Sequence, residues 1–365
     1  MPPETMSLRA LNRALLARQL LLERKTATPL RVVEALAGMQ AQLARPPYVG
    51  MWSRVPAFRR ETLTAAITKR QIVRATMMRG TIHVVSARDF VAFRATLQPM
   101  LSTGMKSVLG DKVKALDLDA VIAAARELFH SGSRTFDTLR GELATRFPQI
   151  DERAMGYAVR THLPLVMVPD GGAWGFPGKP EFADAEAWLG KLTGVKQHAA
   201  TLMVRYLGAF GPATVADAQE WSGMSGLAAV FDALRPQLAV FRDERQRELF
   251  DVPRAPRPEG SVEAPVRFLP DYDNILLAHA DRRRIIADVN RKAISTPNLR
   301  VLATFLIDGF VAGTWRVETK RKTATLVLTP FAPLTQTARE IVAAEGEGLL
   351  AFLEPDAVSR ELRFA

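Results

Sequence analysis

An order of predicted elements that occurs three times along the chain constrains its fold more than any other feature. The middle copy is the clearest. Apolar residues at helical spacing predict helices at 119–130 and 136–147, and 151–162 predicts a third whose acidic start suits a helix N-terminus. Residues 165–177 follow as strand, Gly-Gly turn and strand. Three helices followed by a hairpin form the winged-helix variant of the helix-turn-helix.

The other two copies have the same order with little sequence identity. The C-terminal copy has predicted helices at 198–210, 212–223 and 226–236 and a hairpin at 238–252. The N-terminal copy is longer, with predicted helices at 11–21, 28–42, 48–55 and 61–73 and a hairpin at 74–87. Thr28 as N-cap and Pro29 behind it mark the start of the second of these helices. We therefore predict three tandem winged helices.

A change in composition near residue 250 separates these copies from the rest of the chain. Residues 251–265 are rich in proline and charge and indicate a linker. Predicted strands follow at 266–277, 302–318 and 323–334, and a helix at 335–353. We expect a mainly α protein with β structure, in which a C-terminal β-barrel-like domain follows the winged helices. The predicted domains are 1–115, with the candidate catalytic motif, 116–195, 196–255 and 256–365.

Composition excludes several kinds of site. The chain has no cysteine, so it has no disulfide, no thiolate nucleophile and no cysteine-ligated metal. Its five histidines are far apart and form no HxxxH pair, which disfavours a metal site. No phosphate-binding or dinucleotide-binding glycine motif occurs in the sequence. We expect neither a metal nor a nucleotide cofactor.

Charge points to a polyanionic partner. The formal net charge is +11 and is spread along the chain, which favours a basic face over a basic tail. The N-terminus lacks the pattern of a signal peptide, and no stretch of about 18 apolar residues could form a membrane span. We therefore expect a cytoplasmic protein that binds nucleic acid and no membrane.

Residues 38–42, Gly-Met-Gln-Ala-Gln, place two amide side chains, Gln40 and Gln42, at the end of a predicted helix. Glutamine is common at solvated helix ends, so this pattern alone is compatible with a structural role. Residues two apart on a regular helix lie about 200° apart around its axis, so both side chains face one site only where the helix ends. Pro46 favours such an end, because it disfavours the helical conformation at Arg45.

Four segments together resemble the AlkZ-like winged-helix DNA glycosylases, the family that includes YcaQ. They are GMQAQ at 38–42, MRGTIHVVSARDF at 78–90, FLPDYDNILLAHADR at 268–282 and IDGFVAGTWR at 307–316. The resemblance implies a bowl of three winged helices and a β-barrel that grips duplex DNA, and excision of bulky alkylated purines, including interstrand crosslinks. It also implies that Gln40 and Gln42 are catalytic, and that Thr81 and His83 form a Thr-x-His element on the following hairpin.

The chemistry of an amide restricts the substrate. A carboxamide neither gains nor loses a proton near pH 7, so Gln40 and Gln42 cannot act as general acid or base. A purine alkylated at N7 or N3 is already cationic and leaves as a neutral base, so it needs only a positioned water and electron-rich oxygens near the developing sugar cation. We therefore expect a glycosylase of cationic N-alkylated purines in duplex DNA, with neutral lesions such as uracil as poor substrates. No lysine lies in the motif, which disfavours a lyase step.

Other candidate residues have two interpretations. Thr81 and His83 share one face of a predicted strand, where they either contact phosphate or sugar at the lesion or make local bonds. Arg79 is next to this element and is a candidate for DNA contact or catalytic support. Tyr48 and Trp52 either flank the lesion or form one core stripe of a helix.

The carboxylates of the C-terminal segment are expected to be structural. Asp271 and Asp273 in Leu-Pro-Asp-Tyr-Asp-Asn suit a turn before a strand, because Asp and Asn bond their own backbone in such turns. Asp308 is predicted in a hairpin turn and Trp315 in the core. Two basic clusters consist of Lys69, Arg70 and Arg74, and of Arg282, Arg283 and Arg284. Some of these residues are expected to contact phosphate, whereas any single arginine is more often a solvated surface charge.

A DNA-binding regulator or architectural protein is the alternative hypothesis, since winged helices often only bind DNA. The glutamine pair separates the two. A regulator typically dimerises on pseudo-palindromic sites, whereas a glycosylase of this kind is expected to bind as a monomer with affinity set mainly by phosphates. Repair of alkylated DNA and self-resistance to a DNA-alkylating natural product are both compatible with the glycosylase hypothesis.

Overall fold

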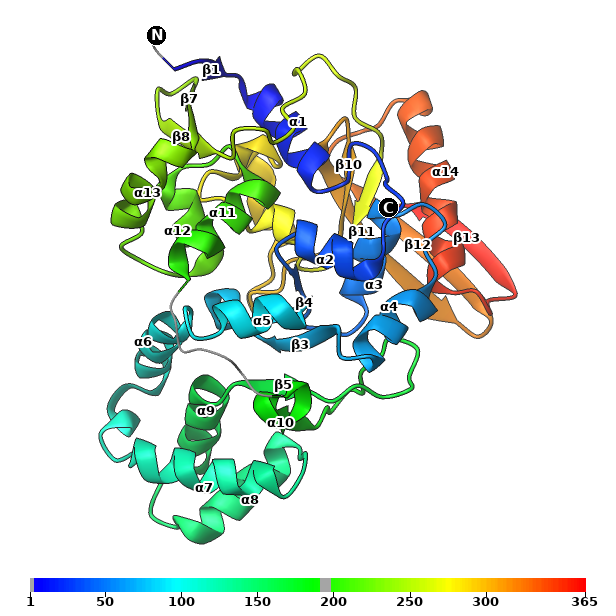
Figure 1. Cartoon of the computed structure of the whole chain (residues 1–365). Helices are drawn as coiled ribbons and strands as arrows, with labels where there is room; N and C mark the ends of the chain where they lie inside the picture. The colour runs from blue at the N-terminus through cyan, green and yellow to red at the C-terminus, as the bar shows by residue number, and fades with distance from the viewer. Residues whose placement is uncertain (1–2, 191–197) are drawn as a thin grey trace.

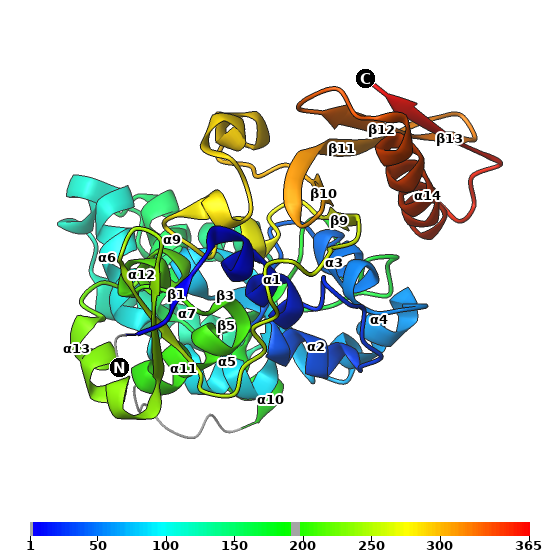
Figure 2. The same ribbon diagram turned by 90° about the horizontal axis from the view of Figure 1, so that it is seen from above.

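The computed structural model describes residues 3–190 and 198–365, which form a mixed α/β protein (Figure 1). Its described strands make three sheets, with strand orders β1-β7-β8, β2-β4-β3-β5-β6 and β13-β12-β11-β10-β9. Figure 2 shows the last of these sheets and α14 (Gln336–Leu353) at one end of the molecule, with α6 (Gln98–Leu109) at the other.

One order of elements occurs three times before this last sheet. It runs helix, short extended segment, two helices and two antiparallel strands, and the short segment pairs with the second strand. The first unit consists of α2 (Pro29–Ala35), β2 (Met39–Gln40), α3 (Pro46–Arg54), α4 (Arg60–Thr68), β3 (Ile72–Thr76) and β4 (Ile82–Ser86). β2 therefore lies on the edge of this sheet, next to β4.

In the other two units the short extended segment is reduced to a single bridging residue. Arg134 pairs with Phe182 in the middle unit, and Ala213 pairs with Phe250 in the last unit. The middle unit consists of α7 (Leu118–His130), α8 (Phe136–Arg146), α9 (Glu152–His162), β5 (Leu165–Met167) and β6 (Phe182–Asp184). The last unit consists of α11 (Ala199–Phe210), α12 (Val215–Ser222), α13 (Ala228–Leu234), β7 (Ala239–Asp243) and β8 (Glu248–Asp251).

The N-terminal unit begins one helix later than predicted. Helix α1 (Leu8–Arg18) precedes it, and α2 takes the place of the first helix. The helix predicted over 28–42 starts after Thr28, as expected, but ends at Ala35. Gly38 then has φ +92°, a left-handed conformation that turns the chain out of the helix and into β2. Gln40 consequently lies on a strand and not on a helix end.

The middle hairpin is longer than predicted. Its second strand is β6 at Phe182–Asp184, and not within residues 173–177. The intervening loop contains Pro177 and Pro180, which have no amide hydrogen to donate to a ladder. β5 pairs with β3 through Val166 and Ala75, so the first two units share one sheet.

The remaining short elements connect the units. Helices α5 (Ala87–Phe93) and α6 lead from the first unit to the middle one, and α10 (Ala185–Leu189) follows β6. Strand β1 (Thr5–Met6) pairs in parallel with β7 of the last unit. Residues 252–265, part of the predicted linker, form no helix or strand, and Arg13 of α1 donates a hydrogen bond to the carbonyl of Val262. The N-terminal segment therefore contacts both the last unit, through β7, and the segment that follows this unit, through Val262.

The C-terminal sheet is open, so the predicted barrel is not confirmed. Its strands are β9 (Arg267–Leu269), β10 (Thr304–Ile307), β11 (Phe310–Lys320), β12 (Thr323–Pro330) and β13 (Ser359–Phe364), with β9 and β13 as the two edges. Closure is not needed to bury its apolar face, because α14 packs there and buries Leu349 and Leu350 with Phe268 and Leu326. β13, which pairs in parallel with β12, was not predicted.

Two structural predictions for this sheet are confirmed. Asp308 and Gly309 form the turn between β10 and β11, where Ile307 pairs with Phe310. Trp315 is 6% exposed, and its Nε1 donates to the carbonyl of Leu269 at 2.9 Å. In the part of the chain that the structure describes, no helix is both long enough and apolar enough to span a membrane.

Candidate active site

Strand pairing brings the glutamine segment next to the Thr-x-His element. Gln40 of β2 lies directly opposite His83 of β4, and the N–H of Ala41 continues the ladder by donating to the carbonyl of Ile82 at 2.7 Å. Directly opposite residues of an antiparallel pair project from the same face of the sheet. Gln40 and His83 therefore share one face, two predicted site residues brought together from positions 43 apart in the chain.

Hydrogen bonds fix the orientation of both amide groups. The Oε1 of Gln40 accepts from Nη2 of Arg79 at 2.7 Å, and the Oε1 of Gln42 accepts from the backbone N–H of Ile82 at 2.8 Å. An arginine and a peptide N–H can only donate, so the oxygen, and not the nitrogen, of each amide faces its partner. A carbonyl oxygen has two lone pairs, which leaves one on each glutamine for a further contact.

Arg79 links the glutamine segment to the last unit. It has φ +56° in the turn between β3 and β4, and its Nη1 donates to the carbonyl of Trp221 at the end of α12. Gly223 allows this close approach, because a Cβ there would lie 3.0 Å from the Cα of Arg79. Burial lowers the pKa of Arg79 to about 10, so the guanidinium remains charged at neutral pH.

Arg74 binds the backbone of the glutamine motif. Its Nε donates to the carbonyl of Ala41 at 2.9 Å and its Nη2 to the carbonyl of Gln42 at 3.1 Å. The residue is 5% exposed, and burial lowers its pKa to about 10. The sequence assigned Arg74 only to a basic cluster, because spacing along the chain could not reveal its contact with residues more than 30 positions away.

His83 is buried and neutral. It has no exposed surface, and its Nδ1 lies 3.1 Å from the carbonyl of Thr81, so Nδ1 carries the proton. Burial, aided by the charge of Arg79, lowers the pKa of His83 to about 3. Thr81 is half-buried, and its hydroxyl donates to the carbonyl of Met78 at 3.1 Å. Both residues thus make local bonds in the protein, and their contact with phosphate or sugar at the lesion stays a prediction.

The two aromatic candidates belong to packing contacts. Tyr48 is 1% exposed, its hydroxyl lies 2.9 Å from the hydroxyl of Thr64, and its ring meets Trp174 edge-on at 5.4 Å. Trp52 stacks on Phe352 of α14 at 6.2 Å. Tyr48 is therefore packed in the core, whereas Trp52 is half-buried, and the role of both residues as lesion-flanking side chains stays a prediction.

Most residues of the predicted basic clusters have protein partners. Arg282 pairs with Glu220 at 2.9 Å and Arg283 with Asp281 at 2.6 Å. Arg284 is 2% exposed and donates to the carbonyl of Pro212. Arg70 donates to the carbonyl of Trp188. These arginines are committed to intramolecular contacts, while Lys69 is exposed.

Two residues that support the site were not predicted to do so. Nδ2 of Asn274 donates to the carbonyl of Gly38 at 3.0 Å, which connects the Leu-Pro-Asp-Tyr-Asp-Asn segment to the glutamine motif. Asp273 caps the following turn by accepting from the N–H of Ile275, and it forms an ion pair with Arg54 at 3.0 Å. The structural role expected of Asp273 is thus present, and the occurrence of both segments in one resemblance was the only sequence signal of their contact.

Gly38 gives a first testable prediction. With φ +92°, and with a Cβ that would lie 2.8 Å from Cγ1 of Val85, its replacement by alanine is expected to lower the free energy of unfolding by about 1–3 kcal/mol and to displace Gln40. Urea unfolding and base release measure the two effects. Gly141→Ala is the control, because nothing lies within 4 Å of its Cβ position on α8, and it is expected to leave both unchanged or slightly improved. Equal behaviour of the two variants would contradict the prediction.

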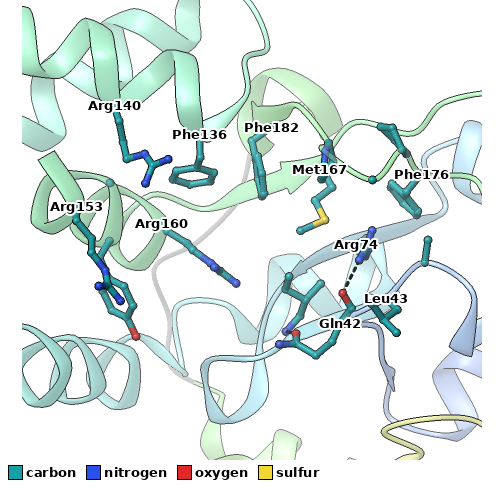
Figure 3. A pocket seen from close by; sticks show the side chains of 17 residues that line it. Gln42, Leu43, Arg74, Phe136, Arg140, Arg153, Arg160, Met167, Phe176 and Phe182 are labelled. Atoms are coloured by element: carbon teal, nitrogen blue, oxygen red, sulfur yellow. Dashed lines mark hydrogen bonds between the residues drawn. The ribbon is translucent and has the colours of Figure 1, made fainter. Parts of the chain in front are cut away.

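Gln42 opens onto a pocket of about 520 Å³ between the first two units (Figure 3). The pocket is lined by α8, α9 and the middle hairpin on one side, and by Gln42, Leu43 and Arg74 on the other. Leu43 is 47% exposed and also borders a second pocket, of about 350 Å³, between the first unit and the C-terminal sheet. Gln40 borders a much narrower space together with Asp273 and Asn274.

Within the described residues, no group of three or more His, Asp or Glu side chains is arranged to hold a metal ion. The site offers two oriented amide oxygens, one bound by Arg79 and one by a peptide N–H, and a pocket at Gln42 large enough for one nucleotide. This arrangement can position a water molecule but cannot exchange protons with a substrate near neutral pH.

Comparisons with known proteins agree on one relationship. The model of the family described as DNA glycosylase AlkZ-like matches residues 33–352. The interstrand DNA cross-link repair glycosylase of Streptomyces sahachiroi is 24% identical over 344 residues, which cover 86% of this chain and 88% of that protein. The solved structure of Streptomyces sahachiroi DNA glycosylase AlkZ has a similar fold, with a TM-score of 0.81 and 21% identity over 99% of this chain and all of that one.

Proposed function

The chain belongs to the AlkZ-like DNA glycosylases, and we propose that it is a monofunctional enzyme that hydrolyses the N-glycosidic bond of cationic N-alkylated purines in duplex DNA. The observation that carries this proposal is the fixed orientation of the two amide oxygens of Gln40 and Gln42. Neither group titrates, so the site suits a leaving base that needs no proton.

We propose different roles in the reaction for the two glutamines, because their amide oxygens have different partners. Gln42 lines the pocket, and the partner of its oxygen is an uncharged peptide N–H, so this oxygen keeps the stronger accepting lone pair. We infer that it accepts a hydrogen from the attacking water and orients the water toward the sugar. The oxygen of Gln40 is already bound by the cation of Arg79, which weakens it as an acceptor. Gln40 then supplies a fixed dipole near the developing sugar cation, and Arg79 is a positioning residue.

Release of free base tests the proposal directly. Duplexes with a single N7-methylguanine or a single uracil are incubated with excess protein, and the free base is measured. The cationic lesion is expected to be released and uracil to remain. Release of uracil at a similar rate would contradict the electrostatic argument, and no release from any alkylated duplex would favour the non-catalytic DNA-binding hypothesis.

A flat pH profile is expected for base release. The pKa of His83 is about 3, that of Arg79 is about 10, and the glutamines do not titrate, so the single-turnover rate should vary less than about twofold from pH 6 to 9. Since the folded pKa of His83 lies below its usual value, burial of the neutral ring stabilises the fold above about pH 6.5, and this is lost as the pH falls toward 3. An inflection near pH 6 to 7 that disappears in His83→Gln would contradict the prediction.

Three finer assignments extend the proposal. The cross-link repair named for the Streptomyces sahachiroi relative suggests interstrand crosslinks as substrates, in general repair or in self-resistance. The three units are proposed to act as winged helices, because each has two helices before its paired strands. The proposed boundaries are those predicted near 115, 195 and 255, of which the one at 195 lies outside the described residues. Binding as a monomer is proposed because affinity set mainly by phosphates does not need the dimer that a regulator uses on pseudo-palindromic sites.

A further inference from the structure

Positive charge dominates the pocket beside Gln42. Four arginines line it, Arg74 from β3, Arg140 from α8, and Arg153 and Arg160 from α9, and none of the lining residues is Asp or Glu. Its apolar part consists of Met167 and the rings of Phe136, Phe176 and Phe182, with Phe136 and Phe182 edge to face at 4.6 Å. The pocket therefore combines an apolar floor with a cationic wall (Figure 3).

The four arginines differ in how far they are committed to the protein. Arg74 is bound to backbone carbonyls of the glutamine segment. Arg140 is paired with Asp137 and lies 3.8 Å from Glu152. Over the described ranges 3–190 and 198–365, neither Arg153 nor Arg160 has a hydrogen-bond or ion-pair partner. Two of the four guanidinium groups are thus available to a ligand.

Arg160 is the more informative of the two available groups. It is half-buried, and burial lowers its pKa from the usual value. A half-buried cation with no counter-ion is unfavourable in the unliganded protein and is expected where an anion binds. Figure 3 shows Arg160 reaching from α9 toward the side of the pocket where Gln42 lies.

Three side chains on one face of α9 line the pocket together. Arg153, Tyr157 and Arg160 are four and three residues apart, so their side chains lie on one face of the helix, and all three line the pocket. α9 is the helix directly before the middle hairpin, the position from which a winged helix contacts DNA.

The positive charge of the pocket favours a phosphate group of the DNA over a cationic alkylated base. A cationic alkylated base would meet four guanidinium groups and no carboxylate, whereas a phosphodiester would meet favourable charge and planar donors suited to its oxygens. We propose that this pocket binds the phosphodiester backbone next to the lesion, and that the cationic base lies outside it. The proposal rests on the proposed function, and it places the sugar of the lesion between the held phosphate and Gln42.

Salt dependence of DNA binding tests the contact. Each phosphate neutralised by the protein contributes about 0.9 to the slope of log K against log salt, so Arg160→Gln and Arg153→Gln are each expected to reduce that slope by about 0.9. Arg160→Lys keeps the charge and is expected to recover most of the slope. Arg126→Gln is the matched control, because Arg126 is exposed on α7, in the same unit, and is not among the pocket residues.

A neutral phosphate analogue identifies the contacted group on the DNA. One methylphosphonate is placed in turn at each phosphate flanking N7-methylguanine, and binding is measured for wild type and for Arg160→Gln. At one position the substitution is expected to weaken binding to the wild type by as much as Arg160→Gln does, and to have no further effect on that variant.

Two results would overturn the proposal. The first is a salt slope unchanged in both Arg160→Gln and Arg153→Gln. The second is a slower base release at saturating DNA with an unchanged slope, which would place the base itself in the pocket. Failure of the proposed function is distinguishable, because a wild type that releases no base still gives the salt slopes and the methylphosphonate positions.

Discussion

Gln42→Ala is expected to slow single-turnover release of N7-methylguanine by at least about 100-fold, the usual effect of removing one preorganised polar group from a transition state. The side chain of Gln42 lines the pocket, and its oxygen accepts only the N–H of Ile82 among the residues that the structure describes, which leaves one lone pair for a water molecule. Removing it leaves the attacking water without its acceptor. DNA affinity is expected to stay within about threefold of wild type, because an uncharged side chain contributes no phosphate neutralisation.

Gln40→Ala is expected to have a smaller effect than Gln42→Ala, because the oxygen of Gln40 is already bound by Arg79. Removing it also leaves one N–H group of the guanidinium without its acceptor, so some loss of stability is expected. Gln71→Ala is the matched control, since Gln71 is an exposed glutamine of the same unit. Base release is measured at saturating protein and affinity by anisotropy. Equal rates for wild type and Gln42→Ala, with equal affinity, would leave both glutamines as structural residues and favour the binding hypothesis.

Asp273→Ala is expected to lower the free energy of unfolding by about 3–5 kcal/mol, the cost of leaving a buried charge without its partner. Asp273 and Arg54 have side chains that are 3% and 1% exposed, and their N···O distance is 3.0 Å. Arg54 also donates to the carbonyls of Gly50 and Gln19, so it cannot move to solvent without breaking those bonds. The variant leaves Arg54 charged inside the protein.

Asp271→Ala offers a control within the same six-residue segment. Asp271 pairs with Arg300 at 2.8 Å, but the two side chains are 20% and 49% exposed, so the expected loss is only about 0–1 kcal/mol. Urea unfolding followed by circular dichroism measures both variants. Equal losses in the free energy of unfolding would contradict the prediction, because they would show that burial of the Asp273–Arg54 ion pair does not increase its contribution to stability. A second readout is base release, which Asp273→Ala is expected to reduce because Asn274, the next residue, holds Gly38.

Local patterns predicted the helices and strands well where each one is specified by its own residues. The helices of the middle and last units lie where apolar spacing placed them, and Thr28, Thr135 and Thr214 accept backbone N–H groups as N-caps. The turn at Asp308 and Gly309 was visible because its residues favour left-handed conformations. Such features depend on neighbours within a few positions, which the sequence displays directly.

The helix prediction failed where two left-handed residues interrupt a helical pattern. Residues 28–42 carry helical spacing throughout, yet the left-handed Ala37 and Gly38 end the helix and make the glutamine segment extended. Gln40 ends β2 and Gln42 lies in the bend that follows it, so the two amides are placed by separate hydrogen bonds, to Arg79 and to Ile82, and not by the spacing of a helix. The barrel failed for a different reason, since alternation predicts strands but does not say whether their sheet closes.

By itself, the sequence determined the order of elements that occurs three times, the net charge, and the motifs that carry the family resemblance. Only the tertiary structure decided what those motifs contact: Arg79 with Gln40, Asn274 with Gly38, and α9 with the pocket beside Gln42. The physical reason is range. Backbone conformation follows from spacing and caps within a few residues, whereas a hydrogen bond across 39 or 236 positions depends on how whole elements pack, which no local spacing encodes.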